Sequence, residues 1–338
     1  MPEPRFLLVR LGSMGDIIHA LPAAAALRDA FPDARIDWAV EPRWGRLLEG
    51  NPDLTEVIPI GRKTPGGFAA GLAKLRVAKY TCAIDFQALY KSAILAFASG
   101  APRRIGFSMS YAREVLAALL YTERLHPRGA HKVEHNLTLA ECAGAEWPAS
   151  GFTPRFPLSV LPEDDDHVTR ELAARSIAEY FVLNPGGGWR SKRWPPERYG
   201  ELHRVLAVRH GWRGVVTFGP GEDDLARRVV EAAGDSPPVA IPLGLGPLMA
   251  LLRRAKFVVS ADTGPLHLAS ALGAPVIGLY GPTDPSRNGP FSPRDVVVRN
   301  AQFCKTTYRR GSGYSKGMLS ITVEQVAAAV ERRLERGP

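Results

Sequence analysis

Residues 257–285, which read FVVSADTGPLHLASALGAPVIGLYGPTDP, decide the fold. The apolar run at 257–260 predicts a buried strand, the segment that begins at Pro265 predicts a helix, and the apolar run at 275–280 predicts a second strand. A strand, helix, strand unit is typical of a parallel sheet, in which ligands bind beyond the carboxyl ends of the strands. We therefore expect a binding site in the polar turn before the helix.

The turn at the start of this helix has the chemistry of an anion site. Unpaired backbone N–H groups and the positive end of the helix dipole meet there, an arrangement that suits a phosphate or a pyrophosphate. We expect a nucleotide-type anion near Thr263, Gly264 and His267. Spacing alone is equally compatible with an ordinary connection that binds nothing.

The length and composition indicate two domains in a globular protein. The chain has 338 residues, more than one compact core usually holds. Its composition changes within residues 144–166, where prolines precede a run of acids, so we expect domains at 1–160 and 161–338. The three cysteines are far apart, which argues against a disulfide framework and a cysteine-based metal site. No apolar run has the length of a membrane span or the form of a signal peptide, so we expect a cytoplasmic protein.

The positive charge is concentrated in one segment. Residues 57–132 contain twelve Lys or Arg against three acids, an excess of nine that equals the formal net charge of the whole chain, +9. Such a segment indicates an anionic partner, which is a nucleic acid, an acidic substrate or an anionic membrane surface. The alternative is a solvated basic face. Aromatic residues do not alternate with the charges as a single-strand nucleic-acid platform requires, so we do not expect a nucleic-acid partner.

The first domain opens with another strand, loop and helix. The apolar run at 5–11 predicts the strand, GSMGD at 12–16 the loop, and Pro22 the start of the main helix. The loop lacks the G-x-G-x-x-G pattern, so a dinucleotide site is only weakly indicated. Asp16 ends this loop, where a carboxylate acts either as a general base toward an attacking hydroxyl or as a helix cap. Alternating strands and helices follow, which predicts a doubly wound α/β domain.

The second domain has polar loops after two predicted strands. The strand at 180–183 is followed by Gly186 and Gly187, which let the backbone approach an anion closely, and by Lys192, which supplies charge to it. This run is not a P-loop. Glu222 follows the next strand, where an acid binds ribose hydroxyls or caps the helix after it.

Residues 110–121 (SYAREVLAALLY) have apolar side chains at helical spacing. The spacing of Val115, Leu116, Leu119 and Leu120 predicts a helix that packs against the domain core. The alternative is a weak contact with a membrane surface.

Several motifs in a fixed order then point to one family. They are LGSMGDIIHALP at 11–22, IDWAVE at 36–41, KRWP at 192–195, ADTG at 261–264 with His267, and YGPTDP at 280–285. Together they resemble the lipopolysaccharide heptosyltransferases of glycosyltransferase family 9, and most closely the members that act on the first inner-core position. The resemblance covers nearly the whole chain.

The resemblance implies a GT-B fold, in which two Rossmann-like domains face a central cleft. It implies that the first domain binds the acceptor and the second binds the nucleotide sugar. The implied reaction is inverting transfer of heptose from ADP-heptose to a Kdo residue of the lipopolysaccharide inner core, with no metal and no cofactor besides the donor substrate. The implied partners are a Kdo-lipid A type acceptor and the anionic inner-membrane surface, on whose cytoplasmic face the enzyme is peripheral.

The resemblance also assigns roles to single residues. Asp16 takes the place of the general base. The donor-binding residues are Lys192, Glu222, Asp262, Thr263, Gly264 and His267, beside the glycines Gly186 and Gly187. The acceptor-binding residues are Ser13, Gly15, Arg62, Lys63, Lys91 and Arg113.

Three features depart from the family pattern. Residues 185–191 are richer in glycine, the segment after Asp85 lacks an expected glycine, and the polar, basic residues 302–317 have no assigned place. These departures leave alternatives open. They are a family member that uses a later core acceptor or another nucleotide sugar, a GT-B nucleotide-sugar epimerase, and a nucleotide-binding module without catalysis.

Overall fold

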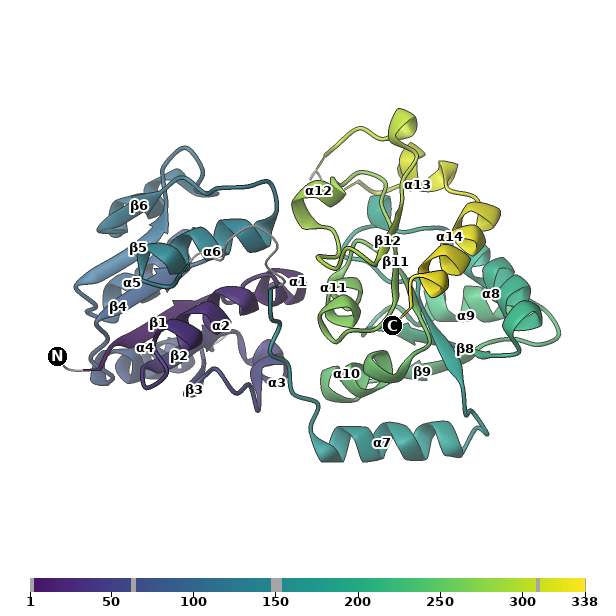
Figure 1. The fold of residues 1–338 in the computed structure, drawn as a ribbon, viewed down its shortest axis with the longest axis horizontal. Coiled ribbons are helices and arrows are strands. Elements are labelled where there is room, and N and C mark those ends of the chain that lie inside the picture. Colours follow the sequence, from purple (N-terminus) through teal and green to yellow (C-terminus); the bar gives the residue numbers. More distant parts are fainter. Residues whose placement is uncertain (1–2, 62–64, 147–153, 308–310, 338) are drawn as a thin grey trace. The chain divides into compact units, whose positions relative to one another are not determined.

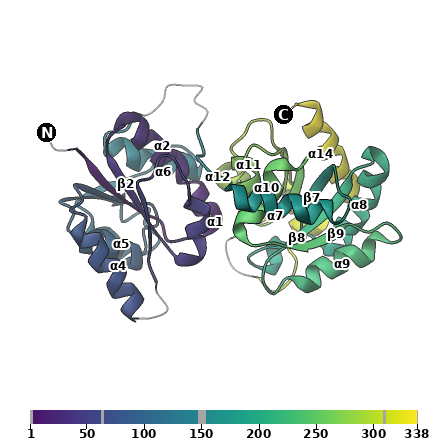
Figure 2. The same ribbon diagram turned by 90° about the horizontal axis from the view of Figure 1, so that it is seen from below.

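The computed structural model describes residues 3–61, 65–146, 154–307 and 311–337. The chain divides into two compact units, Met1–Ser159 and Val160–Pro338. Each unit holds one six-stranded sheet covered by helices (Figures 1 and 2). These sheets confirm the predicted α/β class with two doubly wound halves.

The first unit alternates strands with helices from its start. Its elements are β1 (Arg5–Val9), α1 (Met14–Ile18), α2 (Leu21–Ala30), β2 (Arg35–Val40), the 3-10 turn η1 (Pro42–Trp44), α3 (Gly45–Leu48), β3 (Glu56–Pro59), α4 (Pro65–Val77), β4 (Cys82–Asp85), α5 (Tyr90–Ala98), β5 (Arg103–Phe107), the 3-10 turn η2 (Val115–Leu120), β6 (Glu123–Leu125) and α6 (Lys132–Cys142). Pro22 lies in the first turn of α2, where its missing N–H and fixed φ cost nothing. The short α1 is therefore separate from the main helix, as predicted.

The strand order places the first loop at the centre of the first sheet. The order is β3-β2-β1-β4-β5-β6, and the neighbouring strands are parallel. Successive connections move outward from β1 on one side and from β4 on the other, so the topological switch point lies between these two strands. In open parallel sheets, the loops that follow the two strands of a switch point diverge, and ligands commonly bind between them.

The second unit repeats this plan. Its elements are α7 (Pro162–Ala173), β7 (Tyr180–Asn184), the 3-10 turn η3 (Arg190–Lys192), α8 (Pro196–His210), β8 (Arg213–Phe218), α9 (Asp223–Ala233), β9 (Val239–Pro242), α10 (Leu245–Arg254), β10 (Val258–Ala261), α11 (Gly264–Ala271), β11 (Val276–Leu279), α12 (Pro285–Asn288), β12 (Val296–Val298), the 3-10 turn η4 (Ala301–Phe303), α13 (Lys316–Ser320) and α14 (Val323–Glu335). The predicted unit at 257–285 is thus β10, α11 and β11.

The second sheet is parallel in the order β12-β11-β10-β7-β8-β9, with its switch point between β10 and β7. Every residue of β7, β10 and β11 is buried, as expected for central strands covered on both faces. Phe181 of β7 stacks on Phe257 with 4.9 Å between the ring centroids. This apolar core fixes the strand ends from which the polar loops depart.

The run of acids near the unit boundary forms the start of a helix. Helix α7 begins at Pro162, before the acids. Proline suits the first helical position, and Glu163, Asp164 and Asp165 then lie in the first turn, where the helix dipole favours negative charge.

The prediction for residues 110–121 is wrong in its packing. The regular element there is only the 3-10 turn η2, and Val115, Leu116 and Leu119 are exposed rather than packed on the core. The small side chains of Ala117 and Ala118 form the buried face instead. Among the helices of the described residues, none combines the length and the apolar character needed to cross a membrane.

Candidate active site

The switch point of the second sheet joins the loops after β7 and β10. Asn184, the last residue of β7, donates from Nδ2 to Ser260 Oγ at 2.9 Å and to Thr263 Oγ1 at 3.2 Å. These bonds fix the glycine loop at 186–188 beside the turn at 262–264. The predicted donor-binding residues of the two loops are therefore brought to one edge of the sheet.

Asp262 is the most strongly paired carboxylate of this edge. Its Oδ2 lies 2.6 Å from Lys192 Nζ, and its Oδ1 lies 3.1 Å from His267 Nε2 and 2.8 Å from Asn288 Nδ2. Burial alone raises the pKa of Asp262, but the hydrogen bond with His267 and the charge of Lys192 outweigh it and hold the pKa well below its ordinary range. Only 3% of its side chain is exposed, and its contacts hold Lys192 and His267 in place.

Lys192 presents its charge at the surface of the same edge. Its amine also donates to the Asp262 carbonyl at 3.2 Å and lies 4.4 Å from the centroid of the Trp189 ring, a cation–π distance. The side chain is 12% exposed, so Lys192 is more accessible than its partner Asp262, whose side chain is 3% exposed.

Glu222 holds the glycine loop and does not cap a helix through its side chain. Its carboxylate accepts from the backbone N–H of Gly187 and of Gly219, both at 3.0 Å, and Arg193 lies 3.4 Å away. Although Glu222 occupies the N-cap position of α9, its side chain makes no capping hydrogen bond. A Cβ on Gly186 would lie 2.4 Å from Oε2 of Glu222, so any other residue here would displace the carboxylate from its present position.

Helix α11 supplies backbone donors to the edge. Thr263 is its N-cap residue, but the Thr263 side chain makes no capping hydrogen bond and is held 3.1 Å from Ser260 Oγ. The N–H groups of the first turn, which starts at Gly264, are thus not capped by that side chain. Lys192, whose amine donates to the Asp262 carbonyl two residues before this turn, adds a positive charge at the same edge.

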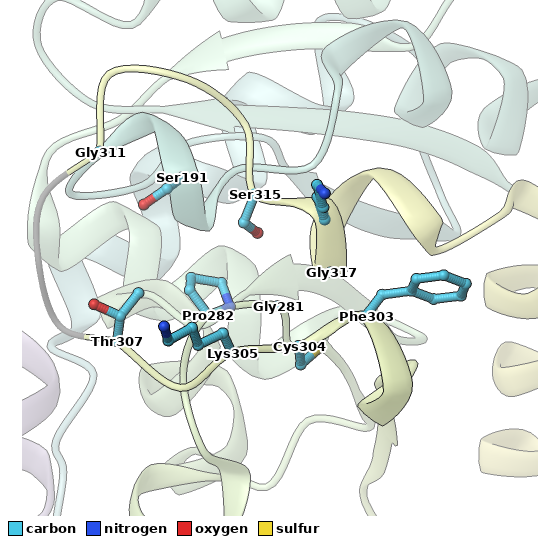
Figure 3. A pocket seen from close by; sticks show the side chains of 11 residues that line it. Ser191, Gly281, Pro282, Phe303, Cys304, Lys305, Thr307, Gly311, Ser315 and Gly317 are labelled. Carbon is cyan, nitrogen blue, oxygen red and sulfur yellow. The ribbon is translucent and has the colours of Figure 1, made fainter.

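A cavity of about 350 Å³ opens beside Ser191, the residue before Lys192 in the chain. Ser191 and the Gly281-Pro282 turn after β11 line one part of it, and residues of the 303–317 segment line the rest (Figure 3). Figure 3 shows Lys305 and Thr307 beside Pro282, across the cavity from Ser191. Among the described residues, the buried Ser191 hydroxyl has no hydrogen-bond partner. Eight described residues of the segment at 302–317, which had no assigned place in the sequence, therefore line this pocket.

The first sheet places Asp16 at its own switch point. Asp16 lies in the first turn of α1, directly after β1, and Ser13 rather than Asp16 holds the N-cap position. Lys132 Nζ lies 2.6 Å from its Oδ1, while Arg10 at 2.8 Å and the Ser13 hydroxyl at 2.9 Å contact its Oδ2. The alternative role of Asp16 as a helix N-cap is therefore wrong.

The two cations set the protonation of Asp16. Burial alone raises the pKa of Asp16, but the charges of Arg10 and Lys132 outweigh it and hold the pKa well below its ordinary value. The carboxylate is therefore ionised at neutral pH. About 20% of its side chain is exposed, compared with 3% for Asp262.

The comparison with known sequences decides the family. Residues 70–316 match the model of glycosyltransferase family 9, the heptosyltransferases. The chain belongs to glycosyltransferase family 9.

Relatives of this family 9 enzyme are similar over nearly their whole length. Lipopolysaccharide heptosyltransferase 1 of Escherichia coli strain K12 is 33% identical, with 87% of this chain and 93% of the relative covered. The solved structure of the E. coli heptosyltransferase WaaC with ADP has a TM-score of 0.75 at 28% identity and covers 98% of each chain. The WaaC structure with ADP-2-deoxy-2-fluoro heptose has a TM-score of 0.76 at 28% identity and covers 99% of this chain and 100% of that one. The predicted glycosyltransferase class and GT-B fold are confirmed.

The other predicted acceptor residues of this glycosyltransferase are spread over the first unit. Gly15 lies within α1 beside Asp16. Lys91, on α5, lies 3.7 Å from Glu41, which follows β2. Arg113 is exposed in the segment before η2. Arg62 and Lys63 lie outside the described residues.

The structure adds residues that the sequence did not indicate. Arg10 and Lys132 flank Asp16, Asn184 and Asn288 brace the second edge, and Arg193 contacts Glu222. Of these residues, only Arg193 is part of a quoted family motif, KRWP at 192–195. Within the described parts of the chain, no group of three or more His, Cys, Asp or Glu is arranged to hold a metal ion.

Proposed function

We propose that this family 9 glycosyltransferase transfers heptose from ADP-heptose to a Kdo residue of the lipopolysaccharide inner core. The observation that carries the proposal is the site formed by Lys192, Asp262 and the start of α11. It lies in a chain similar to an E. coli heptosyltransferase whose structures hold ADP and ADP-2-deoxy-2-fluoro heptose. Residues 161–338 are then the donor domain and residues 1–160 the acceptor domain.

The donor site holds the diphosphate without a metal in this proposal. Lys192 and the N–H groups of the first turn of α11 neutralise the charge that develops on the departing ADP. The Glu222 carboxylate fixes Gly186 and Gly187 against the same edge. The cavity beside Ser191 offers hydroxyl groups and lysine amines to a sugar rich in hydroxyls.

The chemical step is a single in-line displacement. Asp16 accepts the proton of the attacking acceptor hydroxyl, whose oxygen forms a bond to the anomeric carbon of the heptose. The bond from that carbon to the phosphate oxygen breaks, and ADP leaves with the electron pair. Attack opposite the leaving group inverts the anomeric configuration.

The acceptor supports the role of Asp16 as base. Arg10 and Lys132 keep the carboxylate ionised but weakly basic. A Kdo carboxylate near these cations competes for their charge, and its own negative charge raises the pKa of Asp16. Acceptor binding thus makes Asp16 a stronger base when a hydroxyl is present.

The basic surface of the first unit fits a lipid-borne, acidic acceptor. Kdo-lipid A carries carboxylates and phosphates, and residues 57–132 hold the whole positive excess of the chain. Ser13, Gly15, Arg62, Lys63, Lys91 and Arg113 contribute the acceptor contacts in this proposal. The enzyme then works as a peripheral protein on the cytoplasmic face of the anionic inner membrane.

An acceptor panel tests the proposal. ADP release from ADP-heptose is measured with Kdo-lipid A, with an acceptor that already carries the first heptose, and with no acceptor. We expect ADP release with Kdo-lipid A, and no release with the heptosylated acceptor or without an acceptor. Preference for the heptosylated acceptor would show that the enzyme glycosylates a later core sugar. Donor conversion without an acceptor would indicate an epimerase.

A further inference from the structure

Two elements of the first unit expose large apolar side chains. Tyr90, Ile94 and Phe97 are on one face of α5, since they are spaced four and three residues apart. Their exposed fractions run from 41% to 56%, and Val115, Leu116 and Leu119 of η2 are exposed by 49% to 55%. We call these six residues the apolar patch.

The two elements of the apolar patch lie side by side. The backbone N–H of Tyr90, at the start of α5, donates to a Glu114 carboxylate oxygen at 2.6 Å, just before η2. At the other end, Arg104 lies over the Phe97 ring at 5.4 Å and donates to the Leu120 carbonyl at 2.8 Å. The start of α5 thus lies beside the start of η2, and the end of α5 lies beside the end of η2.

Small residues join the buried faces of the two elements. Ala93 of α5 packs with Ala117 and Ala118 of η2 and with Tyr121 in one buried cluster. Because alanines fill the seam, the bulky side chains of both elements project outward. A group of this size on a soluble protein marks an interaction surface, whereas single exposed apolar residues do not.

Three basic residues adjoin the apolar patch, and we call them its basic rim. Lys91 follows Tyr90 on α5, Arg104 stacks on Phe97, and exposed Arg113 precedes η2. All three belong to the segment that holds the net positive charge of the chain. Two copies of this chain docked through their patches would bring these cations together, so the charges favour an anionic partner over a second copy.

We propose that the apolar patch inserts into the interfacial region of an anionic phospholipid bilayer, while its basic rim binds the lipid headgroups. Aromatic and aliphatic side chains enter the headgroup boundary, and each nearby cation adds attraction to anionic lipid. The inference rests on the proposed function for its biological purpose, which is to hold the acceptor domain beside a lipid-borne acceptor. The surface itself is defined by this chain alone.

Vesicle cosedimentation tests the proposal. The probes are phosphatidylcholine vesicles and vesicles in which about one-third of the lipid is phosphatidylglycerol. Wild-type protein is expected to bind the anionic vesicles, more weakly at high salt. The double substitution Leu116→Asp with Leu119→Asp is expected to weaken this binding ~10-fold or more, because it removes inserted side chains and adds repelled charges.

A matched control and two further measurements decide between outcomes. Val208→Asp replaces a valine that is 89% exposed on α8 of the second unit, and it should leave vesicle binding unchanged. The patch variant should keep the wild-type melting temperature and its turnover of a deacylated, water-soluble acceptor. The proposal would be overturned if the wild type does not bind the vesicles, or if the patch variant binds them as well as the wild type does. It would also be overturned if the wild type is a dimer and the patch variant is a monomer. Failure of wild type with the soluble acceptor would instead count against the proposed function.

Discussion

The two switch points of the molecule each hold an aspartate paired to a lysine, yet the two aspartates differ in what can reach them. Asp262 has a 3% exposed side chain that contacts Lys192, His267 and Asn288. Asp16 pairs with Lys132 and Arg10 but keeps 20% of its side chain exposed. The same residue type at equivalent ends of two sheets is thus almost fully buried in one unit and partly exposed in the other, and only the exposed one is the base in the proposed function.

The largest expected effect comes from removing the exposed carboxylate. Asp16→Asn keeps the shape of the side chain and loses the proton acceptor, so kcat with Kdo-lipid A should fall by roughly 10²–10⁴-fold. The affinity for ADP should stay at the wild-type value, because the donor residues belong to the other unit. Steady-state ADP release measures kcat, and calorimetry measures the affinity for ADP. Near-normal turnover would show that Asp16 is not the base.

Breaking the buried pair should affect both stability and donor binding. Lys192→Ala leaves Asp262 charged and buried without its lysine, which costs about 3–5 kcal/mol in the free energy of unfolding. The departing diphosphate also loses its cation, so turnover should fall by roughly 10²–10³-fold and ADP affinity should fall with it. Denaturant unfolding and ADP titration are the measurements. Lys74→Ala, which removes an exposed lysine paired with Glu56, is the control and should change neither.

A glycine pair sharpens the role of Glu222. Gly186→Ala places a Cβ 2.4 Å from Oε2 of Glu222, so the carboxylate has to shift and its bonds to the N–H groups of Gly219 and Gly187 weaken. We expect a loss of about 1–3 kcal/mol in unfolding free energy, together with weaker ADP binding. Gly188→Ala meets nothing within 4 Å and should behave as wild type. Equal effects of the two substitutions would argue against the bracing role of Glu222.

The smallest effect concerns pH. Protonation inactivates a carboxylate base, so kcat/KM should fall as the pH drops through the pKa of Asp16 in the free enzyme. Arg10 and Lys132 depress that pKa, which places the acid limb below the ordinary range of aspartate. Lys132→Ala removes one of the cations, raises the pKa and should move the acid limb to higher pH. If the pH–rate profile of Lys132→Ala matches that of the wild type, Lys132 does not control the pKa of Asp16.

Much of this arrangement was predictable because its signals are local. Strands that end in glycine loops placed Asp16, Lys192 and the turn at 262–264 at the carboxyl edges of two parallel sheets. In such sheets the strand ends meet at one edge whatever the distances along the chain. The family motifs then assigned the chemistry of these positions.

The partners of these residues were not predictable, since they come from distant parts of the chain. Lys132 is 116 residues from Asp16 in the sequence. Gly187, whose N–H donates to Glu222, is 35 residues from Glu222. Leu116 and Leu119 were misplaced because their spacing fits a buried helix, whereas the alanines between them form the packed face. Residues 302–317 follow no periodicity, and their place depends on contacts such as that of Gly317 against Cys304.

The contrast between the two aspartates is tested most directly by measuring single-turnover heptose transfer and ADP affinity on Asp16→Asn and Asp262→Asn in parallel. Asp16→Asn should lose transfer and keep ADP affinity. Asp262→Asn should lose ADP affinity, because Lys192 and His267 are no longer held in place, and should recover transfer in part at saturating donor. A reversed pattern, with transfer intact in Asp16→Asn or ADP affinity intact in Asp262→Asn, would contradict the account.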